Sequence, residues 1–195
     1  MTTKDLLVVA FCLSSSVTGE TGELTDPDYQ ARFLLHRAVR GGADWTGWAI
    51  VPDVTNHQPL RGLVLGGIVV GTKSQWLELM GGTFIGTNGS SEPVLDLRTL
   101  VKGKRLMFFG EIQYATTSRR LLVGPAVTIP FRLGEKTFGV GGEMDYIILP
   151  SGNVLAAGPR VVLPVPLCNK CSLAVAYQFR TGRSDIVRSY FLVNF

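Results

Sequence analysis

The sequence predicts an all-β protein: an antiparallel, up-and-down (meander) β-barrel with a short amphipathic helix near its amino terminus. Three observations lead to this fold class. Charged residues make up only 17% of the 195 residues, against about 25% in typical soluble domains. The mean hydropathy is +0.25, yet no run of about 18 apolar residues occurs, so no transmembrane helix is predicted. From residue 105 onward, short turns regularly separate segments of strand length.

Residues 1–24 resemble a secretory signal peptide. Lys4 precedes an apolar stretch at 6–13, and small residues at 14–19 fit the rule for a cleavage site. Asp5 at the edge of this short stretch fits the rule less well. We therefore interpret residues 1–24 as a signal peptide or a flexible amino terminus, and residues 25–195 as a single barrel domain.

Residues 27–40 fit a short amphipathic helix. Asp26 can cap it, Pro27 suits the first helical position and Gly41 can end it. A strand is the alternative, because apolar residues in this stretch also recur with a spacing of two. In that case one face of the strand carries Ala31, Phe33, Leu35 and Val39. Both interpretations remain open at the level of sequence.

The regular meander covers residues 61–195. Strands at 61–71 and 76–86 come first, and the long connection 87–104 contains PVLDLR, which can form another strand. Counting from residue 61 gives about eight clear strands, and candidates nearer the amino terminus raise the number to ten or twelve. Prolines inside the strand pattern require bulges or bends.

The chain closes with a hairpin over residues 172–195. Leu173, Val175, Tyr177 and Phe179 alternate with smaller or polar residues in its first arm, and Phe195 ends the chain within the second arm. A terminal strand that ends in Phe resembles the last strand of the small bacterial outer-membrane β-barrel superfamily. The resemblance covers about residues 45–195, and it implies an integral membrane barrel without specifying an activity.

The polar face of the predicted strands is rich in glycine and alanine, with isolated acids and arginines. A face exposed to water would carry more long polar side chains, so we expect this face to line a crowded lumen in which charges pair. The large apolar residues then face lipid. We predict a lumen ion-pair network of Glu78, Glu111, Glu143, Asp145, Arg132, Arg160, Arg180 and Arg188. A structural role is favoured for these charges over a catalytic one.

Aromatic residues on the apolar face are expected to contact lipid or the membrane interface. Trp45 and Trp48 flank an apolar run, as interface aromatics do, although two packed tryptophans in an ordinary strand give the same pattern. The predicted set comprises Trp45, Trp48, Phe108, Tyr114, Phe138, Tyr146, Tyr177, Phe179, Phe191 and Phe195.

Other candidate sites are few. Cys168 and Cys171 form a C-x2-C motif that fits a local disulfide in an oxidising compartment. A zinc site would need further ligands, and the sequence offers only His36 and His57 besides, so no metal is predicted. No catalytic motif is present, and no catalytic residue or cofactor is predicted.

The expected partner is the lipid bilayer, together with lipopolysaccharide or other outer-membrane or periplasmic proteins. Nucleic acid is not expected, because the net charge is only +4 and the basic residues are scattered. The expected location is the bacterial outer membrane, and the alternative is a secreted or periplasmic soluble protein.

Four functions fit this pattern. The first is a non-enzymatic barrel with a structural, adhesive or complex-scaffolding role and a lumen filled by side chains. The second is a lipid-modifying enzyme, which requires His36 or His57 at the barrel rim. The third is a soluble, lipocalin-like carrier of a small apolar ligand, with the apolar face turned inward. A narrow pore becomes an alternative if the strand number reaches ten or twelve.

Overall fold

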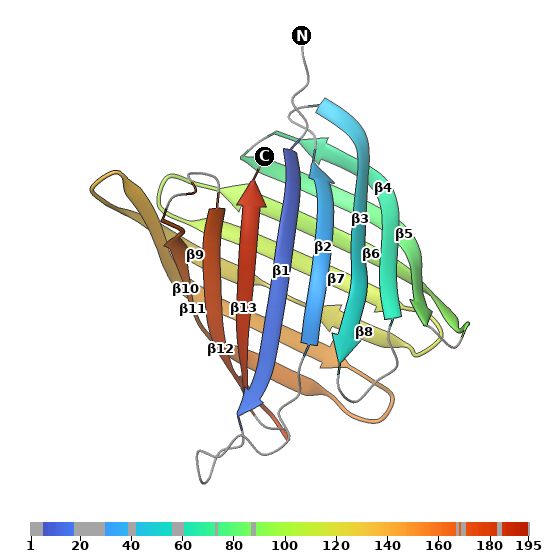
Figure 1. Cartoon of the computed structure of the whole chain (residues 1–195). Coiled ribbons are helices and arrows are strands. Elements are labelled where there is room, and N and C mark those ends of the chain that lie inside the picture. Colours follow the sequence, from blue (N-terminus) through green and yellow to red (C-terminus); the bar gives the residue numbers. More distant parts are fainter. Residues whose placement is uncertain are drawn as a thin grey trace.

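The computed structural model describes residues 6–17, 30–38, 42–55, 61–72, 74–86, 89–166, 168, 171–182 and 185–194. These residues form one antiparallel sheet (Figure 1). Its strands are β1 (Leu6–Val17), β2 (Gln30–Ala38), β3 (Gly42–Thr55), β4 (Arg61–Gly71), β5 (Gln75–Gly86), β6 (Ser91–Lys102), β7 (Met107–Ala115), β8 (Arg120–Val123), β9 (Ala126–Leu133), β10 (Lys136–Ile148), β11 (Val154–Pro164), β12 (Cys171–Arg180) and β13 (Asp185–Asn194). No helix in these parts of the chain is long and apolar enough to cross a membrane.

The sheet closes on itself into a barrel. Each strand pairs with the strands before and after it in the chain, except that β8 and β9 do not pair with each other, and β13 pairs with β1. Strands β8 and β9 both lie between β7 and β10, so the thirteen strands of the described chain occupy twelve positions around the barrel. The meander topology is thus confirmed, and the twelve positions match the highest strand number among the sequence predictions.

Gly124 and Pro125 separate β8 from β9 without opening the wall. The backbone N–H of Gly124 donates to Glu111 O (2.8 Å), and the N–H of Glu111 donates to Gly124 O (3.2 Å). On the other side, the N–H of Met144 donates to Pro125 O at 2.9 Å. Proline cannot donate to a ladder, so the strand pattern is interrupted here while most hydrogen bonds continue.

The amino-terminal prediction of a helix over residues 27–40 is wrong. Residues 30–38 form strand β2, which pairs with β1 on one side and β3 on the other. Two neighbouring strands provide hydrogen bonds along both edges, whereas a short helix beside the barrel would be marginal by itself. The structure therefore adopts the alternative prediction, a strand in which apolar residues recur at every second position.

Residues 6–17 form strand β1, between β13 and β2. This stretch contains the apolar segment that we interpreted as part of a signal peptide. An apolar run of about this length fits a buried strand as well as a signal sequence. Cleavage after it would remove β1 and open the barrel between β13 and β2. The rest of the predicted signal, 1–5 and 18–24, lies outside the described residues.

Candidate functional site

The two faces of the barrel wall differ sharply in exposure. On β5, Leu79 exposes 54% of its surface while the adjacent Glu78 exposes 0%, and on β6, Leu95 exposes 56% while Asp96 exposes 1%. Adjacent residues of a strand point to opposite faces, so the apolar side chains face outward and the charged ones face the lumen. The outward apolar residues include Val64, Ile68, Val70, Leu77, Leu97, Ile112, Ile129, Phe131, Val140, Val161 and Leu163. This orientation is the reverse of the one that a lipocalin-like carrier requires.

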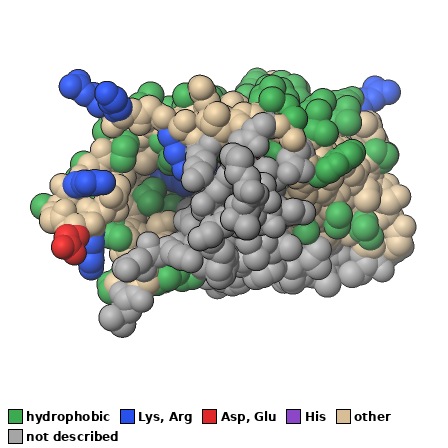
Figure 2. Space-filling model, turned by 90° about the horizontal axis from the view of Figure 1, so that it is seen from above, with side chains coloured by type: hydrophobic (Ala, Val, Ile, Leu, Met, Phe, Trp, Pro, Cys, Tyr) green, Lys and Arg blue, Asp and Glu red, His purple; other side chains and the backbone are tan. Residues whose placement is uncertain are grey.

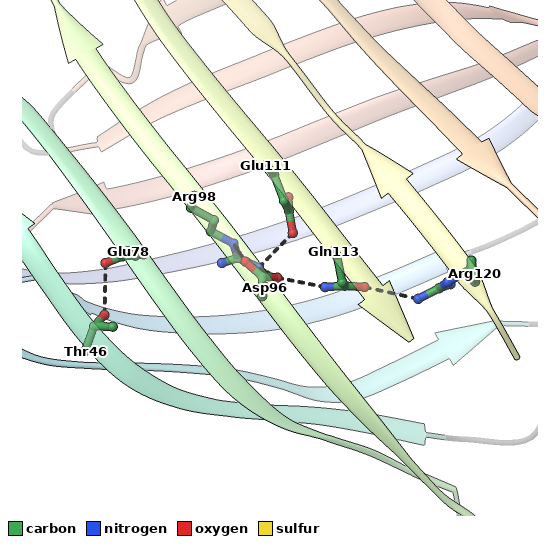
Figure 3. A network of polar contacts seen from close by, with 7 residues as sticks. All are labelled: Thr46, Glu78, Asp96, Arg98, Glu111, Gln113 and Arg120. Carbon is green, nitrogen blue, oxygen red and sulfur yellow. Dashed lines mark hydrogen bonds and ion pairs between the residues drawn. The ribbon is translucent and has the colours of Figure 1, made fainter. Parts of the chain in front are cut away.

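Arg98 on β6 is the centre of one charged group in the lumen (Figure 3). Its Nε lies 2.8 Å from Asp96 Oδ1, and its Nη2 lies 2.8 Å from Glu111 Oε1. Arg98 lies opposite Glu78 on β5 and opposite Glu111 on β7 in the strand register. Directly opposed residues share a face, with Cβ atoms about 5 Å apart. The register therefore places these charges next to one another.

Polar side chains extend this group along the lumen wall (Figure 3). Gln113 donates from Nε2 to Asp96 Oδ2 (2.9 Å), and its Oε1 accepts from Arg120 Nη2 (3.1 Å). Thr46 donates from Oγ1 to Glu78 Oε1 at 2.9 Å. We call the residues Thr46, Glu78, Asp96, Arg98, Glu111, Gln113 and Arg120 the Arg98 cluster. Because its most buried charges are paired or hydrogen-bonded, it stabilises the wall instead of leaving isolated charges in it.

A second charged group lies across β10 to β13. Glu143 accepts a hydrogen bond from Gln178 Nε2 at 2.8 Å, and its carboxylate lies 3.6 Å from Arg160 Nη1 and 3.8 Å from Arg188 Nη1. Arg188 also forms a close ion pair with Asp145. Arg160 and Arg188 lie on either side of the buried Ala176 of β12 in the register. We call Glu143, Asp145, Arg160, Gln178 and Arg188 the Glu143 cluster.

The two clusters meet at Gly124. A Cβ placed on Gly124 would lie 3.2 Å from Asp145 Oδ1 and 4.0 Å from Glu111 Cβ. Asp145 belongs to the Glu143 cluster and Glu111 to the Arg98 cluster. The interruption between β8 and β9 therefore lies where the two charged groups come together, and they form one charged belt from β5 to β13.

Six of the eight residues predicted for the lumen network lie in this belt: Glu78, Glu111, Glu143, Asp145, Arg160 and Arg188. Arg132 does not, because it is exposed near the end of β9 and forms no ion pair with any residue that the structure describes. Arg180 lies at the end of β12, where its backbone N–H donates to Asp185 Oδ1 at 3.1 Å. Arg132 lies at the end of the hairpin, beyond the region where β9 pairs with β7. Its side chain is therefore outside the lumen.

The central residues of the belt were not predicted from the sequence. Asp96 and Arg98 lie in the segment that was treated mainly as a connection, and Gln113 and Gln178 were not singled out. The signal was present in PVLDLR, where Leu95 and Leu97 alternate with Asp96 and Arg98. This alternation has the same period of two as the strands that were recognised.

Most of the predicted lipid-facing aromatics lie on the outward face. Trp45 exposes 73% of its surface and Phe179 60%. Phe108, Tyr114, Phe138, Tyr146, Tyr177 and Phe191 share this face by register. Phe195 lies outside the described residues.

The prediction that Trp48 faces lipid is wrong, because its side chain faces the lumen. It lies opposite the buried Leu65, and the Cζ of Arg98 lies 3.6 Å from its ring centroid. Residues three apart in a strand point to opposite faces, so Trp45 and Trp48 of the same strand cannot both face lipid without a bulge between them. Trp48 therefore belongs to the interior.

The remaining candidate sites are the two cysteines of the C-x2-C motif and the two histidines. Cys168 and Cys171 are joined by a disulfide in the turn before β12. Within the described chain, no group of three metal-ligating side chains occurs. His57 lies outside the described residues, and for His36 the structure describes only the backbone, opposite Trp48 in the register.

Comparison with solved structures identifies barrels with the same architecture. A KdgM porin superposes with a TM-score of 0.69 at 10% sequence identity, over 96% of this chain and 99% of that chain. A KdgM porin in complex with disordered oligogalacturonate superposes with a TM-score of 0.65 at 9% identity, over the same shares of the two chains. No protein-family model and no curated protein matches the sequence. The likeness establishes the fold, a β-barrel that spans the length of the chain.

Proposed function

We propose that this protein is an integral β-barrel of the bacterial outer membrane whose lumen lets small hydrophilic solutes diffuse through. The observation that carries this proposal is the closed sheet with twelve positions, apolar outside and charged inside. An eight-stranded barrel is just filled by its own side chains, and the diameter grows with strand number. A barrel with four further positions has room for a narrow aqueous path.

The outward face supports insertion in a bilayer. Isoleucine, leucine, valine and phenylalanine side chains there expose about half of their surfaces, which in water would be a costly apolar patch but in lipid is the expected contact. The similarity to KdgM porins fits the same location. The predicted partners, in addition to the bilayer, remain lipopolysaccharide and other proteins of the outer membrane or periplasm.

The exposed arginines of the Glu143 cluster favour anions. The side chains of Arg160 and Arg188 are 16% and 23% exposed, whereas the Glu143 carboxylate that they share is 7% exposed. Glu143 thus lies closer to the wall than the two arginines, whereas in the Arg98 cluster the order is reversed, because Arg98 is 2% exposed and Glu111 is 21% exposed. Arginine-lined pores select anions. One of the similar structures holds an oligogalacturonate, whose sugar rings carry carboxylates.

A structural role with a filled lumen is the second candidate, and one observation favours it. Leu63, Met80, Val94 and Arg98 in the lumen wall are each at most 2% exposed. Side chains therefore fill the space beside that wall. In this case the barrel would act as a scaffold or adhesive element and would not conduct.

Ion conduction separates the two candidates. Purified protein, first shown to be folded by its faster migration on a gel before boiling, is inserted into a planar bilayer with a gradient of KCl. The diffusion channel predicts discrete conductance steps and a reversal potential of the sign for chloride preference. Arg188→Ala should shift that potential toward zero, whereas Arg132→Ala, outside the belt, should leave it unchanged. A folded protein that inserts without any current would instead support the structural role.

A further inference from the structure

The lumen holds a group of apolar side chains that a simple water-filled pore does not need. Leu63, Leu65, Met80, Val94 and Ala115 are each at most 2% exposed and pack together, and Trp48 and Phe84 pack against them. All seven lie on the lumen face of β3 to β7. In the strand register Trp48 is opposite Leu65, Leu63 opposite Phe84 and Val94 opposite Ala115, and Met80 is opposite the buried Asp96. We call these seven residues the apolar layer.

The apolar layer lies toward one end of the barrel. Leu63 is near the start of β4, Phe84 near the end of β5, Val94 near the start of β6 and Ala115 at the end of β7. The start of β1 and the end of β13 lie at the opposite end (Figure 1). Figure 2 looks onto that opposite end, which is hollowed and shows basic and hydrophobic side chains within. A solute that enters there passes the charged belt before the apolar layer.

Arginine side chains hold the aromatic rings of the layer inside the lumen. Arg98 on β6 lies over Trp48 on β3 at 3.6 Å, although β4 and β5 separate the two strands. Neighbouring strands are about 4.8 Å apart, so β3 and β6 lie on the order of 14 Å apart along the wall. The two side chains therefore meet inside the barrel and span the curve of the wall. Arg120 on β8 likewise lies over the Phe84 ring, at 5.1 Å.

We propose that the apolar layer is a hydrophobic gate in the conduction path, with its two partly buried rings, Phe84 and Trp48, as the residues that limit it. The inference rests on the proposed diffusion channel and adds the place where ion flow is limited. A narrow apolar segment excludes water and ions even when its width would admit them, because the water there loses hydrogen bonds. Phe84 and Trp48 lie on the lumen face and are only partly buried, whereas the other five residues of the layer are fully covered, so these two rings border the open space.

The test compares substitutions of similar size and different polarity. Phe84→Ala and Phe84→Ser remove the same ring, and Trp48→Ala and Trp48→Ser form a second pair. Ile85→Ala and Ile85→Ser are the matched controls, because Ile85 is the next residue on β5 and is 50% exposed on the outward face. All six variants are first checked for heat-modifiable migration, so that only folded barrels enter the bilayer experiment.

Single-channel conductance in symmetric KCl is then measured for each folded variant. The gate predicts that Phe84→Ser raises conductance by roughly twofold or more, and that each serine variant conducts better than its alanine counterpart, because serine hydrates the segment. Equal increases for serine and alanine would reduce the layer to a steric constriction and overturn the gate. Conductance equal to the wild-type value in all four lumen variants would also overturn it.

The failure of the gate is distinct from the failure of the proposed function. A wild-type protein without current that gains current with Phe84→Ser refutes the freely diffusing channel but supports the gate. A conducting wild type with unresponsive variants supports the channel and refutes the gate. If the wild type and both serine variants are silent when folded and inserted, the channel and the gate are both refuted.

Discussion

Arg98 and Glu111 face each other across β6 and β7, with Nη2 of the arginine 2.8 Å from Oε1 of the glutamate. The same guanidinium binds Asp96 at 2.8 Å and lies over the Trp48 ring. One side chain therefore joins the charged belt to the apolar layer. Removing it should affect both.

Arg98→Ala should be strongly destabilising. It leaves the buried Asp96 and its neighbour Glu111 without the guanidinium that pairs with both, and breaking a buried ion pair from one side costs about 3–5 kcal/mol. The change in the free energy of unfolding is measured by titrating the protein in lipid vesicles with urea and reading the folded fraction from its migration on a gel. Arg132→Ala is the control, because that arginine is exposed and outside the belt. Equal midpoints for the two variants would contradict a stabilising role of the Arg98 cluster.

Trp45 and Trp48 should respond oppositely to lipid. A protein that keeps only Trp45, with Trp48→Phe and Trp76→Phe, should lose fluorescence in vesicles of lipids with brominated acyl chains, because Trp45 is 73% exposed on the outward face. The protein that keeps only Trp48 should be little affected, since this ring packs against Arg98 in the lumen. Strong quenching of Trp48 would mean that the faces of β3 are assigned the wrong way round.

Gly141→Ala and Gly66→Ala should have effects of opposite sign. A Cβ on Gly141 would overlap the backbone carbonyl of Val127 on β9, which cannot move aside without breaking the ladder, whereas a Cβ on Gly66 meets nothing within 4 Å. We expect Gly141→Ala to abolish most of the folded, fast-migrating form. Gly66→Ala should stabilise the barrel by about 0.5–1 kcal/mol, because alanine loses less backbone entropy in a strand. Unfolding midpoints and the folded fraction on gels test both, and a well-folded Gly141→Ala protein would refute the close approach of β9 and β10.

The disulfide between Cys168 and Cys171 predicts a count of thiols. The chain has three cysteines, so maleimide should add one label to the denatured, unreduced protein and three after reduction. Mass spectrometry of the intact chain reads both numbers directly. The Cys12→Ser variant should give no label before reduction and two after it. Three labels without reduction would show that the pair is not joined.

The alternation of apolar and polar residues predicted the meander and the outward orientation of the apolar face. Alternation is local, and it fixes which residues share a face wherever the strand is regular. For the same reason, PVLDLR already held the information that Asp96 and Arg98 point to the lumen. The strand was less evident because it lies within a long connection and contains Pro93, a residue that is uncommon inside strands.

The amino-terminal third is where local pattern failed. Residues 6–17 and 30–38 fit a signal segment and a helix as well as strands, since short apolar stretches do not distinguish these structures. Their place is decided by pairing with partners far away in sequence, above all by β1 with β13, which joins the two ends of the chain. Pairing between segments so far apart in the chain cannot be predicted from the pattern of a short stretch of sequence.

By itself, the sequence determined the fold class, the disulfide candidates and most of the lumen charges, because residue type and a period of two are properties of the chain read locally. Only the tertiary structure decided the closure at β1, the inward position of Trp48, and the convergence of Arg98 on Asp96, Glu111 and the apolar layer. These depend on which strands become neighbours and on how far side chains reach across a curved wall. Strand register and barrel curvature are collective properties of the closed sheet.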